Sequence, residues 1–255
     1  MTCGVQFAGA RDACPVCDDS RQWVPVEGQQ WTTLEDVQAS HTNAIRPEGD
    51  LIAIGTEPRF AIGQRALLVP YGERNLLWEC VTLLDEDTAA EIEARGGLSA
   101  IAISHPHYYA TMVEWAHRFS CPVYVHEADR DWVMRDDEAI TFWSGETYDL
   151  GSDLTLIRCG GHFAGGTVLH RPGDLLTGDI VQVIPDRNWV SFMYSYPNLI
   201  PLPETSVRAI AYALESFEYE RIYGAWWGTV IPQDGKGIVK RSAERYIAAL
   251  HGKLP

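Results

Sequence analysis

Residues 98–110 read LSAIAISHPHYYA, and this stretch decides how the rest of the chain is interpreted. Its first seven residues form an apolar, strand-like run, so His105 and His107 follow the carboxyl end of a buried strand, where α/β proteins usually place their functional sites. Imidazole is a common metal ligand but also serves as an ordinary polar group. The pair therefore predicts a metal site only if further ligands meet it.

Two later segments supply candidates for those ligands. Residues 160–166 read GGHFAGG and hold His162 in a glycine-rich loop between two predicted strands, where the backbone can bend to aim the side chain. Residues 176–179 read LTGD and place Asp179 after a third strand. Three imidazoles and one carboxylate, all at strand ends, suit one Zn²⁺ or Fe²⁺. Asp179 would serve either as a fourth ligand or as the base that orients a bound water.

The surrounding sequence predicts an α/β fold. Apolar runs at 51–58, 59–63, 65–72 and 75–84 indicate four consecutive antiparallel strands. Strands and helices then alternate, with helices expected at 87–95, 108–119, 127–134, 203–217 and 236–250. The second half of the sequence follows the same order of strands and helices as the first. Two mixed sheets that face each other, with helices on their outer faces, are therefore expected, which is a four-layer αββα sandwich.

In their order and separations, the three motifs resemble those of the metallo-β-lactamase superfamily. The family pattern is a His-x-His-x-Asp-His loop, a Gly-His-x-x-Gly loop, a Gly-Asp strand end and a late His-Gly, and the resemblance covers about residues 50 to 230. It implies an αββα sandwich with a metal site along one edge.

The chain departs from this pattern at three positions. Tyr109 and Ala110 stand where the first motif has Asp and His, and Trp227 stands where the last motif has His. The resemblance implies that all three missing residues belong to one of the family's two metal positions, whereas the ligands of the other are present as His105, His107 and His162. We therefore expect a site rebuilt for one metal ion, with Tyr109 and Trp227 filling the space of the second.

Aromatic residues are frequent near the expected mouth of this site. Tyr108, Trp189 and Trp227 are candidates for an apolar substrate pocket. Tyr109 is a candidate catalytic residue that would donate a hydrogen bond to an oxyanion, although the favoured interpretation of this residue is that it fills a gap.

Residues 1–47 form a polar, Cys-rich N-terminal extension that we expect to pack on a main domain at 48–255. Cys14-Pro15-Val16-Cys17 is a knuckle whose thiolates can chelate Zn²⁺, and Cys3 offers a third ligand. The segment resembles an extension of some bacterial metallo-β-lactamase-like proteins that has a further Cys-x-x-Cys pair. Either that pair would precede Met1, or His41 or Asp18 completes a structural zinc site, or no metal binds.

Composition narrows the choice of partners. The chain has 255 residues, with 20 basic and 35 acidic side chains and a formal net charge of −15, which disfavours nucleic acid and anionic membrane surfaces. The sequence shows neither an apolar run of about eighteen residues nor a secretory signal pattern. We expect a cytoplasmic protein, a monomer or small homo-oligomer, that acts on a small molecule.

The primary functional hypothesis is a metal-dependent hydrolase of a small, partly apolar ester, thioester or lactone-like substrate, with one metal ion activating water. The alternative is a catalytically silent binding protein of the same fold with a rebuilt aromatic site. An iron-dependent oxidative enzyme is less favoured, because the two-metal ligand set that supports such chemistry is incomplete here.

Overall fold

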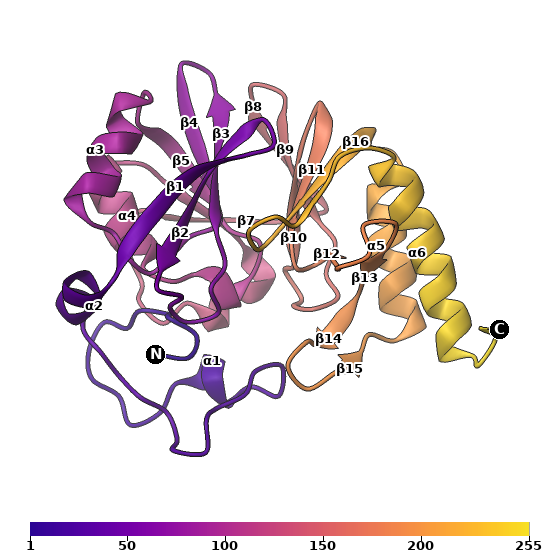
Figure 1. Ribbon diagram of the computed structural model, residues 1–255, viewed down its shortest axis with the longest axis horizontal. Coiled ribbons are helices and arrows are strands. Elements are labelled where there is room, and N and C mark those ends of the chain that lie inside the picture. Colours follow the sequence, from indigo (N-terminus) through magenta and orange to yellow (C-terminus); the bar gives the residue numbers. More distant parts are fainter. Residues whose placement is uncertain (255) are drawn as a thin grey trace.

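Two large β-sheets lie face to face in the computed structural model, which describes residues 1–254 (Figure 1). The first sheet contains seven strands in chain order, namely β1 (Thr42–Glu48), β2 (Leu51–Glu57), β3 (Ala66–Tyr71), β4 (Arg74–Trp78), β5 (Leu98–Ala102), β6 (Val123–His126) and β7 (Ile140–Trp143). Strands β1 to β4 pair antiparallel, and β4 to β7 pair parallel. Three of the four expected antiparallel strands are confirmed as β2, β3 and β4, and so is the βα alternation that follows them.

The second sheet has six strands in the order β17-β16-β11-β10-β9-β8. Their bounds are β8 (Thr147–Gly151), β9 (Leu154–Arg158), β10 (Thr167–Arg171), β11 (Gly173–Gly178), β16 (Tyr219–Gly224) and β17 (Val230–Ile231). Two small hairpins lie beside this sheet, β12 (Gln182–Val183) with β13 (Val190–Ser191) and β14 (Met193–Ser195) with β15 (Ile200–Pro201).

Helices cover the outer face of each sheet, so the predicted αββα sandwich is confirmed (Figure 1). The first sheet is covered by α3 (Glu86–Ala94) and α4 (Met112–Phe119), and the second by α5 (Glu204–Leu214) and α6 (Gly235–Leu250). Helix α3 begins at the Asp85 cap, whose carboxylate accepts the Thr88 N–H at 2.8 Å. Gly96 and Gly97 follow its end, as the sequence indicates.

The alternation of side chains along the strands creates this layering. Leu67, Val69, Leu76 and Trp78 face the second sheet, where Leu156 and Leu176 belong to the same buried cluster. Their neighbours Leu68 and Leu77 point to the other face and pack in the cluster that contains α3 and α4. Because both faces are apolar, these strands read as continuous hydrophobic runs.

Some local expectations differ from the structure. Residues 59–63 form a turn rather than a strand, because Ala61 and Gly63 have positive φ angles of 51° and 77°. The expected short helix after β6 is a 3₁₀ helix, Glu127–Trp132. Strand β1 begins at Thr42, so the segment expected to be an extension contributes a strand to the first sheet.

The N-terminal segment up to His41 contains only two short helices, α1 (Pro15–Asp18) and α2 (Leu34–Ser40). It runs along one end of the sandwich, from α2 below the first sheet to the β14–β15 hairpin of the second half (Figure 1). Among residues 1–254, none of the helices combines the length and hydrophobicity needed to cross a membrane.

Candidate metal centre

His105 and His107 lie on the turn that follows β5. His105 has extended backbone, and Pro106–Tyr108 then form a 3₁₀ turn closed by the Tyr108 N–H, which donates to the His105 carbonyl at 3.1 Å. The turn reverses the chain within three residues. Both imidazoles consequently remain at the carboxyl end of the first sheet, where they are almost fully buried.

The loop between β9 and β10 carries His162. The N–H groups of Cys159 and Gly160 both donate to the Gly166 carbonyl, at 2.7 and 2.9 Å, which closes the loop. Gly161 has a φ of 81°, and a Cβ at this residue would lie 2.8 Å from Ile210 Cδ1 of α5. A side chain at this position would therefore displace the helix or the loop, so the glycine is required to place His162.

Asp179 directly follows β11, and the glycine before it allows the two sheets to meet. Gly178 has a φ of 54°, and a Cβ at this residue would lie 2.7 Å from Glu79 Oε1 and 2.8 Å from Ser104 Oγ. The end of β11 can approach the end of β5 only without a side chain at residue 178. This approach places the Asp179 carboxylate beside His105.

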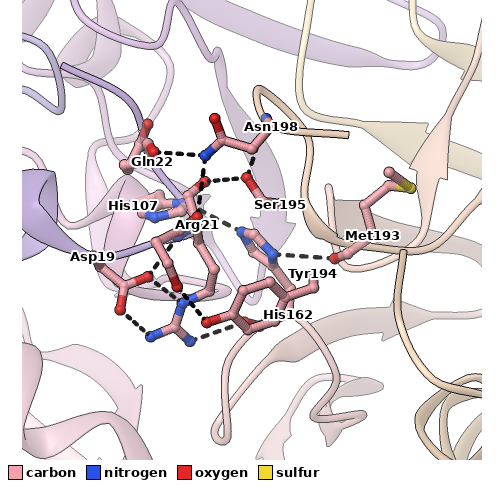
Figure 2. Close-up of polar contacts among 10 residues, drawn as sticks. Asp19, Arg21, Gln22, His107, His162, Met193, Tyr194, Ser195 and Asn198 are labelled. Atoms are coloured by element: carbon pink, nitrogen blue, oxygen red, sulfur yellow. Dashed lines mark hydrogen bonds and ion pairs between the residues drawn. The ribbon is translucent and has the colours of Figure 1, made fainter. Parts of the chain in front are cut away.

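The three imidazoles converge on one point. One ring nitrogen from each of His105, His107 and His162 lies within 4.8 Å of the others. His162 Nε2 lies 3.1 Å from His107 Nδ1 (Figure 2), and Asp179 Oδ1 lies 3.3 Å from His105 Nε2. Within the described chain, His105 Nε2, His107 Nε2 and Asp179 Oδ1 are buried without a hydrogen-bond partner. Such unpaired groups are costly unless they bind something, so the site fits a metal ion.

Neighbouring groups fix the ring orientations. His162 Nδ1 lies 3.2 Å from the Met193 carbonyl (Figure 2), and because a carbonyl only accepts, this nitrogen carries the proton. His105 Nδ1 lies 2.8 Å from Ser104 Oγ. His105 Nε2 is unpaired among the described residues, and His162 Nε2 lies 3.1 Å from His107 Nδ1 within the imidazole cluster. Hydrogen bonds of this kind on the other ring nitrogen orient a ligating histidine.

Burial keeps the imidazoles neutral. It lowers the pKa of His105 and of His107 well below the ordinary value, and it lowers the pKa of His162 to about 4. Burial also raises the pKa of Asp179 to about 7. Neutral imidazole offers the lone pair that a cation needs, and a cation beside Asp179 would favour its ionised form.

Two buried side chains behind the ligands were not recognised as a pair from the sequence. Glu79, which follows β4, accepts the Ser104 N–H at 3.1 Å, and burial raises the pKa of its carboxyl to about 8. Tyr108 packs edge-on against His105, with ring centroids 4.4 Å apart. Glu79 thus supports the turn that carries His105, although no sequence motif identified this role.

A cavity of about 370 Å³ opens above the metal-binding residues. His107, His162 and Asp179 line its floor, and the opposite wall comes from the N-terminal segment. We call residues 19–23 the strap. Arg21, Gln22 and Trp23 of the strap line the cavity, together with Ile62, Tyr196 and Trp226 of the main domain.

The strap is held over the cavity by polar contacts (Figure 2). The Arg21 guanidinium donates to the His162 carbonyl at 3.0 Å and lies 3.7 Å from the centroid of Phe163. Its Nε and Nη2 atoms donate to the two Asp19 oxygens at 2.5 and 2.9 Å. Asn198 donates to the Gln22 carbonyl at 2.9 Å. The sequence offered no signal for this arrangement, because the strap matches no motif.

The structure places the predicted aromatic residues away from the cavity wall. Tyr108 is fully buried behind His105, and Tyr109 belongs to the core of the first half. Trp189 packs on Arg245 at 4.1 Å from the guanidinium carbon. Trp227 covers Gly55 of β2, whose added Cβ would lie 2.8 Å from the indole nitrogen. Trp226 lines the cavity in its place.

A second group of possible metal ligands lies in the N-terminal segment. The sulfurs of Cys3, Cys14 and Cys17 lie within 4.8 Å of one another, and all three residues are buried. The structure does not bring the two candidate fourth ligands into this group. His41 stacks edge-on with Phe60, and Asp18 accepts from Gln29 Nε2 at 2.6 Å.

Comparison with solved structures identifies the fold as that of the metallo-β-lactamases. The DIM-1 metallo-β-lactamase superposes with a TM-score of 0.62 at 15% identity, covering 82% of this chain and 100% of its own. FIM-1 from Pseudomonas aeruginosa, in its mono-zinc form, gives 0.55 at 16% identity, covering 84% and 97%. A flavoprotein from Thermotoga maritima gives 0.54 at 11% identity, covering 83% and 62%.

Sequence comparison identifies a relative that shows the family of this chain. The chain is 49% identical to the uncharacterized protein YmaE of Bacillus subtilis (strain 168) over 265 residues, covering 99% of this chain and 96% of the relative. It therefore belongs to the same family as YmaE. No protein-family model matches the chain.

Proposed function

We propose that this protein is a hydrolase that uses one metal ion held by His105, His107 and His162. The observation that carries the proposal is the convergence of three buried, neutral imidazoles at the floor of a cavity, with His105 Nε2 unpaired within residues 1–254. Zn²⁺ and Fe²⁺ both accept such a set of nitrogen ligands. The mono-zinc form of FIM-1 has the same fold.

Each side chain of the site then has a distinct task. When bound, the ion would lower the pKa of a coordinated water and polarise a substrate oxygen. Asp179, with Oδ1 3.3 Å from His105 Nε2 and no partner among the described residues, would accept a proton from that water or complete the ligand set. The contacts from Ser104 and the Met193 carbonyl would hold the ligand rings in position.

The cavity limits the class of substrate. A volume of about 370 Å³ suits a small molecule, and Trp23, Ile62 and Trp226 provide apolar walls. The Arg21 guanidinium is occupied by Asp19 and by the His162 carbonyl, so it is not free to bind a substrate anion. We therefore propose a small ester, thioester or lactone with an apolar body.

The test combines metal content with turnover. The wild-type protein, His105→Ala and His251→Ala are purified without added metal, analysed for zinc and iron, and assayed on a panel of esters, thioesters and lactones with and without chelator. We expect His105→Ala to lose one metal ion per chain and all chelator-sensitive turnover. His251 is an exposed residue after α6 and serves as the control, so its replacement should leave both unchanged.

Two outcomes would contradict the proposal. If His105→Ala keeps the wild-type metal content, the imidazole cluster is not the metal site. If the wild-type protein binds panel compounds in a metal-dependent manner but turns none of them over, the alternative of a binding protein with an aromatic site replaces the hydrolase.

A further inference from the structure

The N-terminal segment has only a small apolar core of its own. Its buried cluster consists of Cys3, Cys14, Val16 and Cys17, with only partly buried hydrophobic residues around it. Its regular structure is limited to the four-residue α1 and the seven-residue α2. A cavity of about 600 Å³ also separates parts of the segment from the main domain. Segments with so little buried apolar surface usually require a cross-link or a structural metal.

The three cysteines come from two parts of the segment that are anchored differently. Cys3 belongs to a stretch docked on the main domain. Next to it, the Gly4 carbonyl accepts from Thr82 Oγ1 at 3.1 Å, and the Gln6 N–H donates to the Ala110 carbonyl at 2.9 Å. The space at Gly4 is filled, because an added Cβ would lie 2.4 Å from Thr82 Oγ1. Cys3 is therefore a fixed point on the half of the molecule that carries His105.

Cys14 and Cys17 belong to the part that continues directly into the strap. Cys14 is the N-cap of α1 and Cys17 lies within its single turn, and the Asp19 N–H donates back to the Pro15 carbonyl at 3.1 Å. The Cys17 N–H donates to the Cys14 carbonyl at 3.1 Å, which closes this turn. The sulfurs of Cys3 and Cys14 lie 3.7 Å apart as free thiols.

We propose that Cys3, Cys14 and Cys17 bind one Zn²⁺, and that this ion fastens the strap over the substrate cavity. Three sulfur ligands leave one position of a tetrahedral ion for a water molecule or another donor. Binding releases the thiol protons and joins the docked stretch at Cys3 to the strap at residues 19–23. Arg21, Gln22 and Trp23 are then kept in the cavity wall by a second metal site that takes no part in the chemistry.

The ion is tested in a background that lacks the imidazole site. His105→Ala protein is saturated with Zn²⁺, freed of excess metal and analysed for zinc, alone and combined with Cys14→Ser, Cys17→Ser or the control Cys121→Ser. Cys121 is also a buried thiol but does not belong to the cluster. We expect one zinc per chain in His105→Ala and in the Cys121 control, and none in the two cluster variants. In Co²⁺-loaded protein, thiolate-to-metal charge-transfer absorption should follow the same pattern.

The fastening is tested by hydrogen exchange of the strap in the same proteins. The N–H groups of Asp19, Arg21 and Gln22 are all hydrogen-bonded, so their exchange reports whether the strap stays in place. We expect exchange over residues 19–23 to become at least about tenfold faster in Cys14→Ser, or after zinc is removed by a chelator, and to recover when Zn²⁺ is returned to His105→Ala.

If zinc remains bound in Cys14→Ser, the three cysteines do not form the proposed zinc site. Zinc that is lost without faster exchange would overturn the fastening role. Because all measurements use protein without His105, they neither require nor test the proposed hydrolase. Failure of the hydrolase would instead appear as missing turnover in the wild-type protein.

Discussion

Replacing Asp129 with asparagine tests how the loop that carries His162 is stabilised. Asp129 lies on the 3₁₀ helix after β6 and is 1% exposed. Its Oδ1 accepts the Gly165 N–H at 2.8 Å, and an added Cβ at Gly165 would lie 2.7 Å from its Oδ2. Asparagine keeps the acceptor oxygen and the volume but removes the charge, so the substitution isolates the cost of burying a carboxylate.

The expected change in the free energy of unfolding follows from the pKa of Asp129. Burial raises the pKa of Asp129 from 3.8 to about 6, against the opposing effect of the Gly165 hydrogen bond. Because the folded protein binds the proton more tightly than the unfolded chain, this group's stabilising contribution is complete below pH 4 and is lost as the pH rises through about 6. The full difference corresponds to about 3 kcal/mol, at about 1.4 kcal/mol for each tenfold change in proton affinity.

The assay is urea unfolding of wild type and Asp129→Asn at pH 4.5 and pH 8, followed by tryptophan fluorescence. The free energy of unfolding of the wild type, relative to the variant, should be about 2 kcal/mol higher at pH 4.5 than at pH 8. Asp131→Asn, an exposed carboxylate on the same 3₁₀ helix, serves as the control for the change in net charge. A wild-type-to-variant difference that stays constant within about 0.5 kcal/mol between the two pH values would refute the reasoning.

Three further substitutions test the site itself. Gly178→Ala should lower the free energy of unfolding by about 2–4 kcal/mol and reduce zinc content. The control Gly173→Ala, at a residue with a positive φ but open space around it, should cost only about 1 kcal/mol. Equal losses in urea titrations of the two variants would contradict the close approach at Gly178. Trp226→Ala should raise KM for an apolar ester about tenfold with little change in kcat, and Trp227→Ala should leave KM unchanged, as steady-state kinetics will show. Asp179→Asn should keep a bound metal in elemental analysis while lowering kcat about 10²-fold or more, and full activity would exclude Asp179 as the base.

The ligands could be identified from the sequence because their signals are local. An apolar run that ends in His105, and a glycine before Asp179, each predict a strand end without knowledge of distant residues. Apolar runs, and the alternation of strands with helices that follows them, in the same way indicated the sandwich. Local patterns suffice wherever the physical cause lies within a few residues along the chain.

The cavity wall could not be predicted because its contacts join residues that lie far apart in the sequence. Arg21 and the His162 carbonyl that it contacts are 141 residues apart, and the strap shows no periodicity that would predict such a contact. The sequence predicts Trp227 as a wall residue, whereas the structure places the adjacent Trp226 in the wall, because neighbouring residues along an extended chain point in different directions. The turn closed by the Thr229 N–H, which donates to the Trp226 carbonyl at 3.1 Å, turns Trp226 toward the cavity and Trp227 toward Gly55.

The turn that departs from the family pattern is in contact with the N-terminal segment. Ala110 stands where the family pattern has a histidine, and its carbonyl accepts the Gln6 N–H at 2.9 Å, while Gln6 Oε1 accepts the Val113 N–H at 3.0 Å. The segment that carries Cys3 is thus docked on the turn where Tyr109 and Ala110 depart from the family pattern. The N-terminal segment therefore has two contacts with the site, since its first residues pack on this turn and Arg21, Gln22 and Trp23 line the cavity.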